Sequence, residues 1–165
     1  MTNSQIEILL VEDNEEDVEL TLHALRKEKL ANHIHVARDG EEALDFLFCN
    51  GAFSERASQS PLKLVMLDLK LPRVDGLEVL KKMRSDPRTK TIPVVILTSS
   101  KEERDLINGY DLGANSYIQK PVDFDQFRNT VKNLGLYWLV INQPPLSHSA
   151  ASSKGQSQSA LVKTV

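Results

Sequence analysis

The chain has 165 residues, of which 41% are hydrophobic and 26% are charged, and its formal net charge at pH 7 is −3. This length and composition predict one domain of ordinary size with a single core. The slightly acidic balance argues against a dedicated nucleic-acid binder, which usually carries a strongly basic face. No apolar run approaches the roughly 20 residues that span a bilayer, and the first residues lack the pattern of a signal peptide. We therefore expect a cytoplasmic protein that binds neither nucleic acid nor a membrane.

The composition changes near Gln143. Residues 143–165 contain six serines, two prolines and no aromatic residue, which leaves little apolar surface to offset the entropic cost of ordering. We expect a folded domain over residues 1–142 and a flexible tail over residues 143–165. The single cysteine, Cys49, excludes an internal disulfide, and we expect it to be a buried small hydrophobic residue.

Five short apolar runs are candidate strands. Three of them contain Ile-Leu-Leu-Val, Leu-Val-Met-Leu and Val-Val-Ile-Leu, whereas a strand with one solvated face would alternate apolar and polar residues. Continuous apolar runs indicate strands that are buried on both faces, as in a parallel sheet. In chain order the five candidate strands are 6–11, 33–37, 62–67, 92–98 and 115–119.

The segments after these runs have apolar residues at helical spacing. The clearest is the last, in which steps of three and four alternate from Phe124 to Ile141, and Asp123 is a suitable N-cap for it. The chain therefore repeats a strand-helix unit five times, which predicts an open parallel sheet with helices on both faces. The other stripes are Val18, Leu22 and Leu25; Ala43, Leu44, Leu47 and Phe48; Leu77, Leu80 and Met83; and Leu106, Ile107 and Tyr110.

Polar and charged residues follow the strands of this predicted sheet. In such a fold, ligands bind beyond the carboxyl ends of the strands, so these residues are expected to lie together. Adjacent carboxylates repel each other, and a divalent cation such as Mg²⁺, which takes few oxygen ligands and keeps several waters, would keep them ionised. A carboxylate is also a competent nucleophile toward phosphorus. The residues concerned are Glu12 and Asp13 after the first strand, Asp68 after the third, Thr98 at the end of the fourth and Lys120 after the fifth.

The residues named above, together with Pro121, resemble the receiver domain of two-component response regulators (the CheY-like family), from about residue 6 to residue 141. The resemblance implies a flavodoxin-like, doubly wound, five-stranded parallel sheet of order 2-1-3-4-5 with five helices. It implies that Asp68 accepts a phosphoryl group from a histidine kinase. It implies that Mg²⁺ is bound directly by Asp13 and Asp68, through water by Glu12, and by the backbone carbonyl of Lys70.

The same resemblance implies how the phosphorylated state is detected. Thr98 would hydrogen-bond the phosphoryl group, Lys120 would pair with it, and Tyr117 would change its rotamer on activation. The bond from Lys120 to Pro121 resembles the cis peptide of the family. A receiver is not an enzyme that acts on a free substrate, because it catalyses only its own phosphorylation and dephosphorylation.

A narrower resemblance is to single-domain receivers that work with cyanobacterial and bacterial phytochromes. It is based on the Glu-Asp-Asn and Leu-Asp-Leu-Lys-Leu-Pro segments, the long connection over residues 51–61 and the end Leu-Tyr-Trp-Leu at 136–139. It implies a phytochrome as the kinase partner and a homodimer. The candidate interface combines the fourth helix, fifth strand and fifth helix with the apolar residues Leu136, Tyr137, Leu139 and Val140. The alternative is that these four side chains fold back on their own domain.

Three other functions are alternatives to a receiver that is phosphorylated. A haloacid-dehalogenase-type phosphatase needs a second aspartate two residues after the nucleophile, where this chain has Lys70. A flavodoxin needs a hydroxyl-rich phosphate loop, and residues 14–17 (Asn-Glu-Glu-Asp) would repel a phosphate instead. A pseudo-receiver, which binds partners without phosphorylation, has the same sequence features and stays as the alternative.

Overall fold

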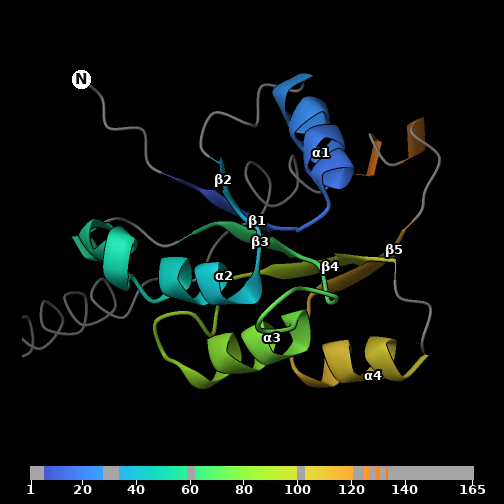
Figure 1. Cartoon of the computed structure of the whole chain (residues 1–165). Helices are drawn as coiled ribbons and strands as arrows, with labels where there is room; N and C mark the ends of the chain where they lie inside the picture. The colour runs from blue at the N-terminus through green and yellow to red at the C-terminus, as the bar shows by residue number, and fades with distance from the viewer. Residues whose placement is uncertain are drawn as a thin grey trace, which may run out of the picture.

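The computed structural model describes residues 6–27, 34–58, 62–99 and 103–120, together with 125–126, 129–130 and 133. Figure 1 shows a central sheet with α1 on one face and α2, α3 and α4 on the other. The strands are β1 (Ile8–Val11), β2 (Ile34–Ala37), β3 (Leu64–Leu67), β4 (Val94–Thr98) and β5 (Ser116–Gln119). The helices are α1 (Glu15–Lys27), α2 (Gly40–Leu47), α3 (Gly76–Ser85) and α4 (Glu103–Asp111), with a 3-10 helix, η1 (Gly51–Ser58), between α2 and β3.

The five strands form one parallel sheet in the order β2-β1-β3-β4-β5, which confirms the expected fold class. Each strand ends where the sequence predicts and begins one or two residues later. Val11 at the end of β1 pairs with Ala37 of β2 on one side and with Leu67 of β3 on the other. The carboxyl ends of these strands are therefore level, and the residues that follow β1 and β3 begin side by side.

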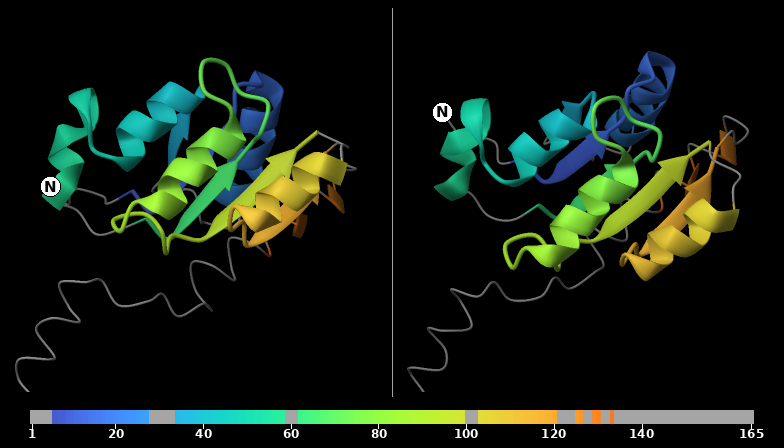
Figure 2. Two further views of the ribbon diagram at one scale, coloured as in Figure 1. Left: turned by 90° about the horizontal axis from the view of Figure 1, so that it is seen from below. Right: turned by 60° about the horizontal axis from the view of Figure 1, so that its bottom comes forward.

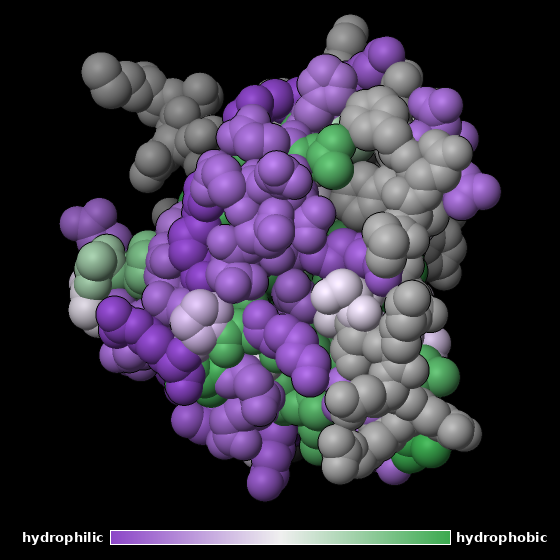
Figure 3. Space-filling model, turned by 45° about the vertical axis from the view of Figure 1, so that its right-hand side comes forward, coloured by the Kyte–Doolittle hydropathy of each residue, from purple (hydrophilic) through white to green (hydrophobic). Residues whose placement is uncertain are grey.

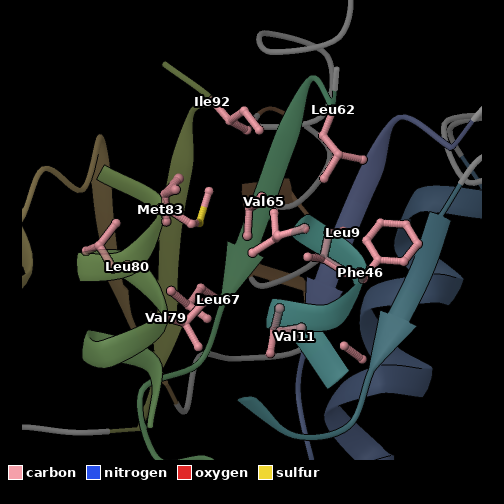
Figure 4. Close-up of a cluster of buried hydrophobic side chains, with 14 of the residues drawn as sticks. Leu9, Val11, Phe46, Leu62, Val65, Leu67, Val79, Leu80, Met83 and Ile92 are labelled. Carbon is pink, nitrogen blue, oxygen red and sulfur yellow. The ribbon is translucent and has the colours of Figure 1, made fainter. Parts of the chain in front are cut away.

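Both faces of the sheet are buried because side chains alternate along each strand. Leu9 and Val11 point to the α2–α3 face, where they pack with Phe46, Val65 and Met83 (Figure 4). Ile8 and Leu10 belong to the opposite cluster, which α1 covers with Val18, Ala24 and Leu25. The continuously apolar runs that predicted a parallel sheet therefore supply two cores, one on each face.

The loop between β3 and α3 folds back so that the start of α3 lies against the residues that follow β3. The Asp75 side chain caps α3 by accepting a hydrogen bond from the Glu78 backbone N–H. Gly76 packs so closely that a Cβ there would lie 2.1 Å from the backbone oxygen of Asp68. Only glycine fits this approach, which holds the end of β3 and the residue after it in place.

The three helices α2, α3 and α4 lie side by side across one face of the sheet, and η1 continues beyond α2 (Figure 2). The long connection expected over residues 51–61 is thus partly helical. Its Phe53 packs edge-on against Phe46 and His35, with ring centroids 5.1 and 5.2 Å apart. The connection is therefore part of the α2 side of the core and not a plain surface insertion.

One expectation about a single residue is wrong, and one predicted helix buries a side that its apolar stripe does not mark. Cys49 is only partly buried, because the chain reverses there with a φ of 57° after α2 has ended. The predicted helix α4 is present, but the apolar stripe that marked it is exposed: Leu106, Ile107 and Tyr110 are 39%, 52% and 50% exposed. Asp105 and Gly109 take the buried side of this helix instead.

Several expectations lie outside the described residues. Of the predicted fifth helix, residues 125–126, 129–130 and 133 are described and are helical. The tail over 143–165, Pro121 and the four apolar residues Leu136, Tyr137, Leu139 and Val140 are not among the described residues. Within the part that is described, no helix combines the length and apolar character that crossing a membrane requires.

Candidate functional site

Three carboxylates meet at the carboxyl edge of the sheet. Glu12 and Asp13 follow β1, and Asp68 follows the neighbouring strand β3. One carboxylate oxygen of each lies within 4.8 Å of the others. Glu12 and Asp68 are buried, whereas Asp13 is exposed to solvent. The structure therefore brings together the three acids that the sequence placed at the two strand ends.

Asp68 is held by the backbone on both sides. Its N–H donates to the carbonyl of Val11 at 3.0 Å, which extends the pairing of β1 and β3 by one residue. Its Oδ1 accepts a 2.7 Å hydrogen bond from the Leu69 N–H, and the Lys70 N–H lies 3.4 Å from the same oxygen. Its other oxygen, Oδ2, lies 3.6 Å from Lys120 Nζ. One oxygen is thus fixed by the chain, and the other faces the lysine.

Lys120 follows β5, the edge strand farthest from β1 and β3 on that side of the sheet, and its side chain is buried among acids. Its backbone N–H donates to the carbonyl of Thr98 at 2.6 Å, directly after β5 ends. Its ammonium donates to Glu12 Oε2 and to Asp17 Oδ2, each at 2.7 Å. Burial alone lowers the pKa of Lys120, but the bonds to Asp17 and Glu12 outweigh it, so its pKa lies above the ordinary value. The ammonium is therefore charged and serves two carboxylates at once.

Glu12 shows how crowded this edge is. The pKa of Glu12 is raised to about 7, mainly by burial and also by the nearby charge of Asp68, although the hydrogen bond from Lys120 lowers it. Its Oε1 accepts from the Asn14 N–H at 3.1 Å while Oε2 accepts from the lysine. Both oxygens are engaged, so the site holds this side chain in one orientation.

Thr98 and Tyr117 lie on the two neighbouring strands at the far side of the sheet. Thr98 ends β4 and is fully buried, and Tyr117 on β5 is partly buried. Tyr117 pairs with Ile96, two residues before Thr98, so the side chains of Thr98 and Tyr117 project to the same face. That face is the one covered by α4, where the Tyr117 ring lies next to Gly109.

One member of the site was missed from the sequence. The sequence presents Asp17 only as one of the acids in the segment after the first strand, yet it lies in the first turn of α1 and binds Lys120. The available signal was helical spacing, because Asp17 precedes the buried Thr21 by one turn and so faces inward. Glu15 and Glu16, which precede it in the same turn, are exposed.

The donor set fits a hard divalent cation. It consists of carboxylate oxygens close enough to share one ion, and the exposed Asp13 leaves room for the waters that Mg²⁺ retains. A cation here would also offset the repulsion between Glu12 and Asp68. An acidic pocket of this kind beside a buried lysine is suited to holding a cation and an anionic group together.

The family model of the response regulator receiver domain matches residues 8–132. The probable methanogenesis regulatory protein FilR2 of Methanothrix harundinacea is 40% identical over 138 residues, which cover 84% of this chain and 86% of that protein. Response regulator Rcp1 of Synechocystis is 37% identical over 132 residues, which cover 80% of this chain and 88% of Rcp1.

Solved structures agree with this match. The phosphorylated cyanobacterial phytochrome response regulator RcpA aligns with a TM-score of 0.77 at 38% identity, over 87% of this chain and 100% of that one. The Mn²⁺-bound form of Rcp1 aligns with a TM-score of 0.77 at 34% identity, over 87% and 100% of the two chains. The bacteriophytochrome response regulator AtBRR is 50% identical, with a TM-score of 0.66 over 85% and 99%. With this fold and this acidic edge, the chain belongs to the response regulator receiver domain family of two-component systems and is similar to phytochrome response regulators.

Proposed function

We propose that this receiver accepts a phosphoryl group from a histidine kinase on Asp68. The observation that carries the proposal is the environment of Asp68, a buried carboxylate with one oxygen held by the Leu69 N–H and the other facing Lys120 at 3.6 Å. A carboxylate oxygen of Asp68 attacks phosphorus as the bond to the donor's imidazole nitrogen breaks, which leaves an acyl phosphate on Asp68. The chain acts on no free substrate and catalyses only its own phosphorylation and dephosphorylation.

The acids at this edge would hold Mg²⁺. Asp13 and Asp68 would bind it directly, Glu12 through water, and Lys70 through its backbone carbonyl. A bound cation neutralises part of the charge that develops on the transferring phosphoryl oxygens. The proximity of the three carboxylates supports this assignment.

Thr98, Lys120 and Tyr117 would detect the phosphoryl group. Lys120 already lies beside Asp68 Oδ2 and carries its charge in a buried site, so it would pair with a phosphoryl oxygen. Thr98 would hydrogen-bond another oxygen, and Tyr117 on the same face would turn in response. The shared face of Thr98 and Tyr117 supports this coupling.

The kinase partner we propose is a phytochrome, and the assembly is a homodimer. The similarity to RcpA and AtBRR, which are phytochrome and bacteriophytochrome response regulators, supports the choice of kinase. The exposed apolar residues of α4 support an interface on the α4–β5 side.

Labelling with acetyl phosphate and Mg²⁺ tests the phosphoacceptor. Wild type should gain one phosphoryl group by intact mass, and Asp68→Asn should gain none while its thermal unfolding stays cooperative. Asp111→Asn removes an exposed aspartate of α4 and should label like wild type. Undiminished labelling of Asp68→Asn would show that another residue is the acceptor. No labelling of wild type would favour the pseudo-receiver instead.

A further inference from the structure

We propose that Asp17 is a positioning residue that competes with Asp68 for the Lys120 ammonium and so sets the affinity of the site for a phosphoryl group. This inference rests on the proposed function of Asp68. Lys120 Nζ lies 2.7 Å from Asp17 Oδ2 and 3.6 Å from Asp68 Oδ2. Of these two acids, the one in α1 is thus nearer to the ammonium. Asp17 belongs neither to the residues that directly follow the strands nor to the group of three carboxylates that could bind a metal ion.

The hydrogen-bonding capacity of Lys120 explains how Asp17 affects the contact between Lys120 and Asp68. An ammonium group has three donors, and two of them are taken by Glu12 and Asp17 at 2.7 Å. At 3.6 Å, Asp68 Oδ2 is beyond hydrogen-bond distance, so it has no direct bond from the lysine. Asp17 and Glu12 therefore hold the charged ammonium of Lys120 beside Asp68, although the ammonium does not hydrogen-bond to Asp68.

Asp17 is fixed in this position by the start of α1. Its backbone N–H donates to the Asn14 side chain at 3.0 Å, and its carbonyl accepts from the Thr21 hydroxyl at 2.8 Å. Asn14 in turn donates its own N–H to Glu12 Oε1 at 3.1 Å. The side chain of Asp17 is 30% exposed, so its bond to Lys120 is only partly screened by water.

A phosphoryl group on Asp68 would bring new anionic oxygens toward the same ammonium. Asp17 opposes them in two ways, because it occupies one of the lysine donors and because its own charge repels an anion. Removing that charge should therefore strengthen the hold of Lys120 on any phosphoryl-like group at Asp68. The bond between α1 and Lys120 would have to lengthen or be shared when the phosphoryl group arrives.

The affinity for fluoroberyllate, a non-covalent phosphoryl mimic, measures this competition. We compare wild type, Asp17→Asn and Glu16→Gln in saturating Mg²⁺ by ¹⁹F NMR titration. Glu16 is a matched control because it is exposed, lies in the same helical turn and carries the same charge. Asp17→Asn should bind the mimic about three- to tenfold more tightly, the range for one partly screened charge-assisted bond. Glu16→Gln should change the affinity by less than about twofold, as an exposed charge does.

A Lys120→Met background tests whether Asp17 acts through the lysine. There the Asp17→Asn change should lose most of its effect, since no ammonium remains to be shared. An equal gain in both backgrounds would overturn the inference, because it would show a general charge effect. Unchanged or weaker binding by Asp17→Asn alone would overturn it as well. A wild type that binds no mimic would overturn both this inference and the proposed function, whereas the two preceding outcomes would overturn the inference alone, so the two failures are distinguishable.

Discussion

Among the acids of the site, position in the fold separates side chains that the sequence presents as equivalent. Glu12 and Asp68 are buried, Asp13 is exposed, and Asp17 lies between these extremes. The pKa of Glu12 is raised to about 7, with burial as the main cause. Each acid therefore has a different environment, which follows from its place in the fold and not from its chemical type.

His35 is a second residue whose surroundings set its behaviour. Its ring stacks on Phe46 with centroids 4.2 Å apart and lies 3.2 Å from Glu42 through Nε2. Burial lowers the pKa of His35 below 6.5, although the hydrogen bond to Glu42 acts in the opposite direction. The folded protein therefore binds a proton here less readily than the unfolded chain does.

We expect this shift to make stability depend on pH. Because the pKa is lower in the folded state, the contribution of His35 to the free energy of unfolding is present above pH 6.5 and is lost as the pH falls through the folded value. His35→Phe keeps an aromatic ring on Phe46 but cannot titrate. In urea unfolding from pH 7.5 to 5.0, wild type should lose stability relative to His35→Phe as the pH falls. A difference that is constant across this range would contradict the assignment.

At the scale of elements, Arg84 connects α3 to the loops that precede β4 and β5. Its guanidinium donates to the carbonyls of Gly113, Ile92 and Lys90 at 2.7–3.0 Å, and to the side chain of Asn115 at 3.2 Å. The same Asn115 oxygen accepts from the Val94 N–H at 2.8 Å, at the start of β4. This clamp lies where β4 and β5 begin, at the opposite end from the acidic site, and holds the turn after α4.

Loss of the Arg84 hydrogen bonds should lower the free energy of unfolding more than loss of an exposed ion pair nearby. Arg84→Met leaves several partly buried oxygens without donors, and we expect a destabilisation of about 2–4 kcal/mol. Arg88→Met removes the pair with Asp86, whose arginine is 65% exposed, and should cost no more than about 1 kcal/mol. Urea unfolding of both variants gives the comparison. Equal costs would show that the bonds of Arg84 add little to stability.

At the scale of the whole molecule, the surface is uneven on the side of α4 and β5. Figure 3 brings this side forward and shows a mostly hydrophilic surface with separate hydrophobic spots. In α4 the exposed apolar residues are Leu106, Ile107 and Tyr110. Tyr117 lies on the adjacent strand, so an interface here would be sensitive to its rotamer.

A homodimer through this side should weaken when α4 is made polar. Ile107 is 52% exposed, and burying it in each copy contributes up to about 1.5–3 kcal/mol. Ile107→Asp should therefore raise the dimer dissociation constant by about tenfold or more. His23→Asp, at an exposed position of α1, should leave it unchanged. Light scattering with and without acetyl phosphate measures both variants, and a strict monomer of wild type in both states would refute the dimer.

How much of the fold the sequence predicts depends on the range of the interactions. The strands were predicted because three continuously apolar runs can be satisfied only where both faces of a sheet are covered. The meeting of Glu12, Asp13 and Asp68 followed from parallel strands, whose carboxyl ends share one edge. The strand order came from the family resemblance and not from the periodicity. For α4, spacing predicted the helix but not its buried side, because that depends on the packing against Ile96 and Tyr117.

Local periodicity and the positions of the strand ends were therefore enough to predict the sheet, the burial of both its faces and the acids at its edge, although not that the buried residues form two separate cores. Which charges pair depends on the tertiary fold. Lys120 and Asp17 are 103 residues apart, and no local pattern relates them. Their contact depends on how α1 lies across the sheet and on which face Lys120 takes after β5. A buried ammonium binds the acids that packing brings within reach, and that is a property of the whole fold.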